Sequence, residues 1–199
     1  MSRGLALFDF DGTITSGDTL FHFLRHALPG PRFALGAVLL LPVLAGYKLG
    51  LIGNARAKSI VLRHFFGGWP EERFRAAGAA FAREMLPLLI RPAALERIRE
   101  HMVNGDRVLV VSASLSDWVG GWCADQGLEL LATEAEVRDG RITGRFATGN
   151  CHGPEKVRRI RAALDPADYA PIHAYGDSSG DREMLALAHE PHFKPFRDV

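Results

Sequence analysis

Residues 5–15 have the sequence LALFDFDGTIT, in which a short apolar segment is followed at once by two aspartates and a glycine. The apolar part, residues 5–8, is typical of a buried strand. Asp9 and Asp11 would then lie at the carboxyl end of that strand, where open α/β sheets bind their ligands. Because alternate residues of a strand share a face, both carboxylates should point into the same space if the strand geometry continues. Two such acids repel each other unless a shared proton or a cation lies between them, and we expect that cation to be Mg²⁺.

The composition is that of one large domain, or of a domain with a small insertion. The chain has 199 residues, an apolar fraction of 47% and a net charge of +1. This charge argues against a broad basic surface for nucleic acid, and the apolar fraction is enough for a packed core. Cys123 and Cys151 have no metal-ligand spacing, so we expect reduced thiols. The N-terminus leads directly into the first strand, so we expect no signal peptide and a cytoplasmic protein.

Apolar strands and amphipathic helices alternate along much of the chain. The predicted strands cover residues 5–8, 107–111, 128–132 and 171–175. The predicted helices begin at Pro92, near Ser114, at Pro154 and after Gly180. Nearly continuous apolar strands indicate an α/β fold with a parallel sheet that is covered on both faces. Alternating residues around Asp139-Gly140 indicate an antiparallel hairpin over residues 134–147.

Two of these helices carry more specific predictions. In the helix that begins at Pro92, we expect Leu95, Ile98 and Met102 to face the core. Residues 114–117, with the sequence SLSD, resemble a capping box. We therefore expect the Ser114 side chain to cap the helix that follows.

Residues 20–90 do not follow the alternation of strands and helices. Their pattern indicates helices only, between the first strand and the helix that begins at Pro92. We therefore predict an inserted all-helical domain over residues 20–90. The main α/β domain would consist of residues 1–19 together with residues 91–199.

The predicted insertion is both cationic and apolar. No acidic residue lies between Asp18 and Glu71, whereas this span holds six lysines and arginines, and residues 33–47 carry no charge at all. A complete membrane span needs ~20 apolar residues, so a helix buried within the protein is favoured over one inserted into a bilayer. A third interpretation is an interfacial segment over residues 33–52 that rests on anionic lipid.

Further polar residues follow the later strands. Ser112 comes directly after the strand at residues 107–111, and this position favours a functional role over that of an ordinary loop serine once the other segments are counted with it. Lys156 lies in the first turn of the helix that begins at Pro154, where the helix dipole disfavours a cation. Asp177 and Asp181 follow the last predicted strand. These positions suggest one polar site at the carboxyl edge of the sheet.

The four segments together resemble the motifs of the haloacid dehalogenase superfamily, whose members are mostly phosphatases. DFDGTIT resembles the first motif, DxDGT, and Ser112 and Lys156 resemble the second and third. GDSSGD, residues 176–181, resembles the fourth motif, GDxxxD. The resemblance spans residues 5 to about 188 and is nearest to the branch that includes phosphoserine phosphatases. It implies a Rossmann-like core with a hairpin extension and an inserted helical cap over the active site.

The resemblance also implies a mechanism and a role for each residue. Asp9 would attack phosphorus and form an aspartyl phosphate, and Asp11 would act as general acid and then as general base. Mg²⁺ would be held by the carboxylates of Asp9 and Asp177 and by the Asp11 backbone carbonyl, with Asp181 supporting the metal shell. The phosphoryl oxygens would be held by Ser112, Lys156 and backbone donors near Gly12 and Ala113.

The substrate is left open by these motifs. The branch usually has an asparagine where this chain has Gly180, and Asp18 lies where that branch often has a glutamate that binds a substrate amine. We expect Asp18 and Arg56 to contact substrate. Phosphoserine-like metabolites and lipid phosphates are both candidates, because the cap is hydrophobic and cationic like that of bacterial phosphatidylglycerophosphate phosphatases. A phosphotransferase and a non-catalytic phospho-ligand-binding relative are the alternatives, and the oligomeric state is not predicted.

Overall fold

The sheet of the computed structural model, which describes residues 3–197, has five parallel strands in the order β3-β2-β1-β6-β7. The strands are β1 (Leu5–Phe8), β2 (Arg107–Leu115), β3 (Glu129–Thr133), β6 (Ile172–Gly176) and β7 (Glu190–Phe193). β1 lies in the centre, with Leu7 opposite Leu109 on one side and Ala174 on the other. The predicted α/β class with a parallel sheet is therefore confirmed.

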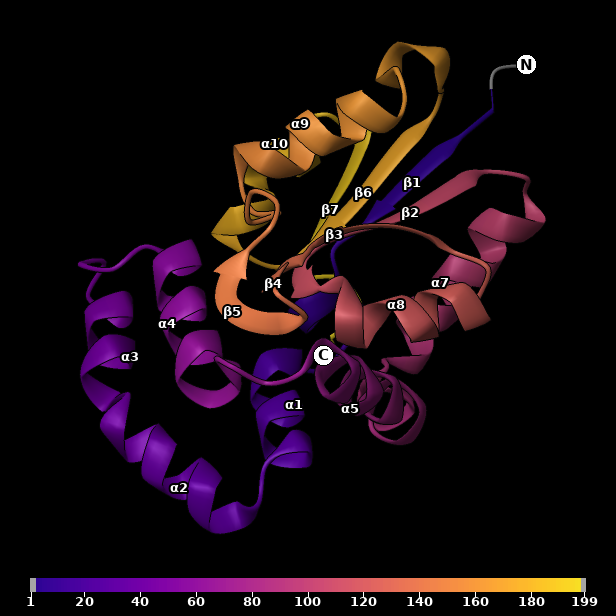
Figure 1. The fold of residues 1–199 in the computed structure, drawn as a ribbon. Helices are drawn as coiled ribbons and strands as arrows, with labels where there is room; N and C mark the ends of the chain where they lie inside the picture. The colour runs from indigo at the N-terminus through magenta and orange to yellow at the C-terminus, as the bar shows by residue number, and fades with distance from the viewer. Residues whose placement is uncertain (1–2, 198–199) are drawn as a thin grey trace.

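Helices cover both faces of the sheet, as Figure 1 shows. The helices α7 (Pro92–Val103) and α8 (Ser116–Asp125) lie on one face, and α9 (Pro154–Ala163) and α10 (Arg182–Leu185) lie on the other. Alternate residues of β1 therefore belong to different cores: Ala6 and Phe8 pack toward α8, whereas Leu5 and Leu7 pack toward α9. Burial on both faces explains why β1 has no polar residue.

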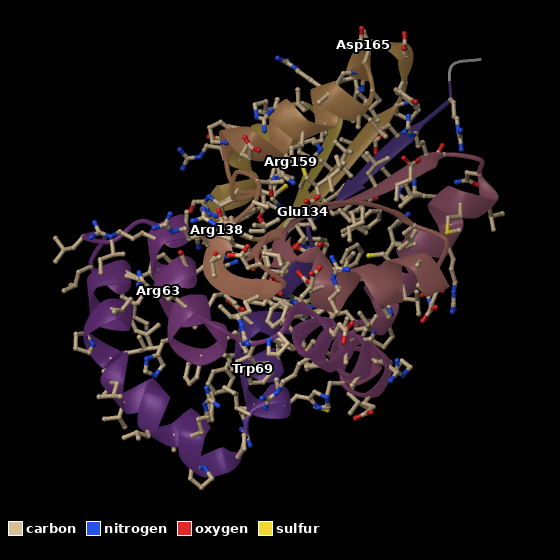
Figure 2. All side chains as sticks on the ribbon, in the orientation of Figure 1. Arg63, Trp69, Glu134, Arg138, Arg159 and Asp165 are labelled. Carbon is tan, nitrogen blue, oxygen red and sulfur yellow. The ribbon has the colours of Figure 1, made fainter. Side chains whose placement is uncertain are left out.

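The predicted hairpin is present as a separate two-stranded sheet of β4 (Ala135–Arg138) and β5 (Arg141–Phe146). Asp139 and Gly140 both have positive φ, 51° and 68°, as a two-residue hairpin turn requires. Backbone hydrogen bonds from Gly68 to Ile142 and from Ile142 to Trp69 join β5 to the segment that follows α4 (Asn54–Phe66). The hairpin thus lies between the sheet and the inserted helices (Figures 1 and 2).

The chain between β1 and α7 is helical, as expected. Its helices are α1 (Thr19–Ala27), α2 (Gly30–Leu39), α3 (Leu41–Lys48), α4, α5 (Glu71–Glu84) and α6 (Leu86–Leu89). The two connections to the main body run side by side, because Ser16 donates to the Leu89 carbonyl and Arg91 donates to the Ile14 carbonyl, both at 2.8 Å. α5 packs against α8 of the main body, so the helices of the insertion are not all remote from it. A domain boundary at residues 19–20 and 90–91 remains a prediction.

Two packing predictions were wrong. Ser114 does not cap a helix: β2 continues to Leu115, and the Ser114 hydroxyl donates to Asp11 at 2.5 Å. α8 has no side-chain cap. Met102 is 42% exposed, whereas Ala94, Ile98 and His101 form the buried face of α7. For Ser114 a tertiary contact with Asp11 decides the outcome, and the local sequence pattern does not contain that contact.

The expectation that residues 33–47 form a buried helix was also wrong. They form α2 and α3, which meet at a bend of 52° and expose most of their large apolar side chains. Within the described chain no single helix has the length and hydropathy to cross a membrane. Taken together, the bent pair α2 and α3 reaches the required length and apolar composition. Both helices lie at the outer edge of the molecule (Figure 1).

Candidate active site

The strand does not continue through the two N-terminal aspartates. β1 ends at Phe8, and Phe10–Ile14 form a tight turn in which Gly12 has φ +78°. A Cβ atom at Gly12 would lie 2.5 Å from Asp177 Oδ2, so both the backbone angle and the close approach require glycine here. The premise of continued strand geometry was therefore wrong, yet the turn brings Asp9 and Asp11 to the same cavity.

This cavity has a volume of about 670 Å³ and lies at the carboxyl edge of the sheet, bordered by the inserted helices. The predicted site residues that line it are Asp9, Asp11, Gly12, Asp18, Ala113, Lys156, Asp177 and Asp181. Ser112 is fully buried beside it, and its hydroxyl accepts a hydrogen bond from the Ser114 backbone N–H at 3.0 Å. Arg56 is exposed on α4 and is not brought to the cavity.

Lys156 lies at the meeting point of three strands. Its ammonium group is buried and donates to Asp9 at 2.5 Å, to the Val111 carbonyl at 2.6 Å and to Asp181 at 2.7 Å. Arg159, labelled in Figure 2, holds the same helix in place by donating to the Ala132 and Gly149 carbonyls. The lysine therefore acts as a fixed charge that joins β2 to the segments that follow β1 and β6.

The site has one buried ammonium for two buried carboxylates. Burial raises the pKa of Asp9 from 3.8 to about 7, against the opposing charge of Lys156. Burial would also raise the pKa of Asp181, but Lys156 holds it below its ordinary value. Burial would lower the pKa of Lys156, but Asp9 and Asp181 hold it above its ordinary value. Lys156 and Asp181 are thus charged, and Asp9 becomes protonated as the pH falls below about 7 unless another cation binds.

A divalent cation would balance the negative charge that Lys156 alone leaves unneutralised on these carboxylates. Asp9, Asp177 and Asp181 each offer a carboxylate oxygen, and these atoms lie within 4.8 Å of one another. Burial, with Asp181 and Asp11 nearby, raises the pKa of Asp177 despite the opposing charge of Arg197, which donates to it at 2.8 Å. An all-oxygen donor set with few carboxylates suits Mg²⁺. These three carboxylates therefore fit Mg²⁺, and the metal site itself remains a prediction.

Asp181 is held mainly by the turn that follows β6. Its Oδ2 accepts hydrogen bonds from the backbone N–H of Asp177 and Ser178 and from the Ser178 hydroxyl, while its Oδ1 accepts from Lys156. Asp181 therefore orients Asp177 and Lys156 at the same time.

Asp11 points toward the inserted helices. Its Oδ1 accepts a hydrogen bond from the Thr19 backbone N–H at 2.8 Å, and its Oδ2 accepts from the Ser114 hydroxyl. Asp18 caps α1 by accepting from the Leu20 N–H, and burial, then the nearby Asp11, raises the pKa of Asp18. Both acids thus lie where α1 begins, at the wall of the cavity that the insertion supplies.

Several cavity residues were not predicted as site residues. Six of these polar side chains are Tyr47, Asn54, Lys58, Arg91, His152 and Arg197. Arg197 donates to Asp177 at 2.8 Å from near the C-terminus, and Lys58 donates to the Ala113 carbonyl at 3.4 Å. None belongs to a local motif, so only the tertiary arrangement reveals them.

The glycine at position 180 has a local explanation. A Cβ atom there would lie 2.4 Å from His152 Nε2, so a longer residue would collide with this imidazole. His152 lines the cavity near Lys156, and burial together with the charge of Lys156 lowers its pKa. An uncharged imidazole thus occupies the space next to Gly180.

Residues 6–186 match the family model of the haloacid dehalogenase-like hydrolases. Protein CicA of Caulobacter vibrioides is 36% identical over 97% of this chain and 86% of its own length. A probable phosphatase of Mycobacterium tuberculosis is 29% identical over the whole of this chain and 71% of its own length.

Solved structures share the fold. A protein of unknown function from Bordetella pertussis has a TM-score of 0.80 and 26% identity, covering 94% of this chain and 88% of that one. A phosphoserine phosphatase studied as a phospho-aspartyl intermediate analogue has a TM-score of 0.62 and 22% identity, covering 94% of this chain and 84% of that one. The likeness to the phosphoserine phosphatase concerns the fold alone.

Proposed function

The chain belongs to the haloacid dehalogenase-like hydrolases and is an enzyme of their phosphatase type, and we propose that it is a Mg²⁺-dependent phosphomonoester phosphatase that acts through an aspartyl phosphate. One observation carries the proposal. Asp9, Lys156 and Asp181, which lie far apart in sequence, form a buried ion cluster at the floor of an open polar cavity. A buried ion cluster is costly for stability, which favours a functional reason for it.

Asp9 is the proposed nucleophile. Its carboxylate attacks phosphorus, a new bond to Asp9 forms, and the bond from phosphorus to the ester oxygen breaks. Asp11 gives its proton to the departing alcohol oxygen. In the second step Asp11 takes a proton from water, the water oxygen attacks phosphorus, and phosphate leaves Asp9 free again. The hydrogen bonds from Thr19 and Ser114 hold the Asp11 carboxyl toward the cavity for both transfers.

The remaining residues position the phosphoryl group and neutralise charge. Lys156 stays protonated between Asp9 and Asp181 and faces the incoming phosphoryl oxygens. Backbone N–H groups near Gly12 and Ala113 and the Ser112 hydroxyl are the other proposed donors. Mg²⁺, held by Asp9, Asp177, Asp181 and the Asp11 backbone carbonyl, would neutralise oxygens that otherwise repel the nucleophile.

The proposed substrate is a small anionic phosphate ester, of which phosphoserine is the first candidate. Its support is the fold shared with phosphoserine phosphatases and the place of Asp18 in the cavity wall. A lipid phosphate is the second candidate, and it is favoured by the exposed apolar helices α2 and α3.

The deciding experiment is the release of phosphate from p-nitrophenyl phosphate with and without Mg²⁺. We expect Mg²⁺-dependent turnover, loss of activity in Asp9→Asn, and trapping of the intermediate as an acid-stable radiolabelled protein band. A folded wild type that releases no phosphate with any divalent metal would make the chain a phospho-ligand-binding relative. Transfer of the phosphoryl group to added alcohols in preference to water would make it a phosphotransferase.

A further inference from the structure

The helices α2 and α3 and the loop after them form an exposed apolar surface. Of the thirteen large hydrophobic side chains that are exposed among the described residues, eight lie between residues 35 and 51. They are Leu35, Val38, Leu39, Leu41, Leu44, Tyr47, Leu49 and Leu51. We call these eight residues the apolar edge. Side chains along α2 and α3 extend outward from the molecule in Figure 2, and a patch of this kind marks an interaction site.

The charges around the apolar edge point to an anionic occupant. No acidic residue lies between residues 19 and 70, while Arg25, Arg32, Lys48 and Arg56 are exposed in this part of the chain. A symmetric contact with a second copy would bring these like charges together. An anionic bilayer surface instead offers acyl chains to the leucines and negative headgroups to the cations.

The same helices border the active site. Tyr47 at the end of α3 and Asn54 at the start of α4 both line the catalytic cavity, and the Asn54 amide donates to the Tyr47 hydroxyl at 3.1 Å. A molecule held at the apolar edge would therefore lie next to the opening of the cavity.

A second, apolar groove connects the two regions. It has a volume of about 200 Å³, lies between α1, α2, α3 and α4, and is lined by Leu20, Leu24, Phe33, Ala37 and Leu40 among others. Asp18 lines both this groove and the catalytic cavity. A polar cavity that meets an apolar groove suits a ligand with a phosphate at one end and a hydrocarbon chain at the other.

From these observations we infer that the apolar edge docks on an anionic bilayer and that the enzyme hydrolyses a membrane-borne phosphomonoester whose hydrocarbon chain enters the groove. This inference rests on the proposed phosphatase function and selects the second of its two substrate candidates, the lipid phosphate. The bilayer is the proposed occupant, and a second copy of the chain is the alternative that the experiment must separate.

Docking is tested by sedimentation with phosphatidylcholine vesicles that contain or lack phosphatidylglycerol. We expect binding only to the anionic vesicles, weaker at high salt, and at least about tenfold weaker for Leu35→Asp/Leu39→Asp. Leu35 and Leu39 are the right targets because they are 64% and 58% exposed, whereas Leu40 is buried. The control Leu88→Asp/Val103→Asp changes two residues elsewhere that are even more exposed, and it should bind like the wild type.

The substrate class is tested with a series of n-alkyl phosphates of increasing chain length below their micelle-forming concentrations. We expect kcat/KM to rise with chain length, by about threefold or more per added methylene pair until the groove is full. Ala37→Phe, which fills the groove, should remove this rise, so that the longest esters are hydrolysed with the same kcat/KM as the shortest.

The outcomes separate this inference from the function on which it rests. Hydrolysis of p-nitrophenyl phosphate without vesicle binding would overturn the inference and leave the phosphatase standing. The same holds for a chain-length series that is flat, or for a dimer in light scattering that Leu35→Asp/Leu39→Asp dissociates in the absence of vesicle binding. No hydrolysis of any ester by a protein that still binds vesicles would overturn the phosphatase function instead.

Discussion

The burial of Asp9 lowers the stability of the folded protein, although the proposed reaction requires this carboxylate. It is buried beside Asp181, and the single charge of Lys156 does not neutralise both carboxylates. Without a metal, and between pH 3.8 and about 7, Asp9 is protonated in the folded protein but ionised in the unfolded chain. The free energy of unfolding therefore falls as pH rises from 3.8 to about 7, and the loss is complete above that range.

Replacing this carboxylate should separate stability from activity. For Asp9→Asn we expect phosphatase activity to fall by about 10³-fold or more, because the nucleophile is lost. In EDTA above about pH 7 the variant should be more stable than the wild type to urea, since the cost of burying the charged carboxylate disappears. Asp125→Asn, on the exposed side of α8, should change neither quantity. An Asp9→Asn protein that is less stable at this pH would contradict the charge deficit.

The proton on Asp9 should also compete with the metal. Below about pH 7 we expect the apparent dissociation constant for Mg²⁺ to rise by about tenfold for each pH unit, because binding must displace that proton. Titration calorimetry in buffers of different ionisation enthalpy would report the proton released. A Mg²⁺ affinity that stays constant between about pH 5.5 and 7 would show that Asp9 is already ionised or does not bind the metal.

Much of the polar floor of the site could be predicted from single residues. Asp9, Asp11, Lys156, Asp177 and Asp181 each follow a strand or open a helix at the carboxyl edge of a parallel sheet, and that edge brings them together. The walls could not be predicted in this way. Lys58, Arg91 and Arg197 approach the cavity from the inserted helices, a linker and the C-terminal segment, and no short pattern encodes those approaches.

Among the secondary-structure elements, strands with apolar runs were predictable and the edge strand was not. β7 has the sequence Glu-Pro-His-Phe, and its proline and exposed side chains resemble a loop. Proline is tolerated there because an edge strand need not donate from every N–H. The prediction for α2 and α3 was wrong for the opposite reason. Their apolar composition predicts burial, but only the tertiary structure shows that no other element of the described chain covers their outer face.

The contact between α5 and α8 depends on one glycine. Gly78 is buried, and a Cβ atom there would lie 2.1 Å from the Asp117 carbonyl oxygen. Because that oxygen belongs to the backbone, the helices themselves would have to move apart. This contact fixes one helix of the insertion to the main body.

We therefore expect Gly78→Ala to lower the free energy of unfolding by about 1–3 kcal/mol, as overpacking does, despite the better helix propensity of alanine. The matched control is Gly120→Ala on α8, where the new methyl group would lie 3.8 Å from its nearest neighbour, Leu130 Cδ2. The control should be neutral or slightly stabilising in urea denaturation. Equal stabilities of the two variants would mean that α5 and α8 are not held as closely as described.

The molecule as a whole contains a second titrating cluster, which does not line the polar cavity, on the face of the sheet where His101 of α7 packs. His173 of β6 lies next to Glu190 of β7, and His192 stacks on Tyr175. Burial lowers the pKa of His173 and His192, and each is lowered further by a neighbouring histidine. The pKa of a histidine in the unfolded chain is 6.5. As the pH falls below this value, the unfolded chain binds protons more readily than the folded protein, so the free energy of unfolding decreases.

Acid should therefore weaken the wild type more than a variant without these imidazoles. For His173→Gln/His192→Gln we expect a smaller loss of stability between about pH 7 and 5 than for the wild type, measured by urea denaturation in EDTA. His64→Gln, on the exposed side of α4, should behave like the wild type. Parallel curves for all three proteins would show that the two histidines do not titrate on unfolding.

The paired connections at Ser16–Leu89 and Ile14–Arg91 have an evolutionary consequence. The chain leaves the main body and returns to it through two adjacent segments. The helices between these segments can therefore lengthen, shorten or be exchanged without altering the strand order. The proposed catalytic residues Asp9, Asp11 and Lys156 lie outside the inserted helices, so new substrates could be acquired while the proposed chemistry is inherited unchanged. The close contact at Gly78 limits which helices could replace the present ones. A replacement for α5 would also need a glycine at this position to pack against α8.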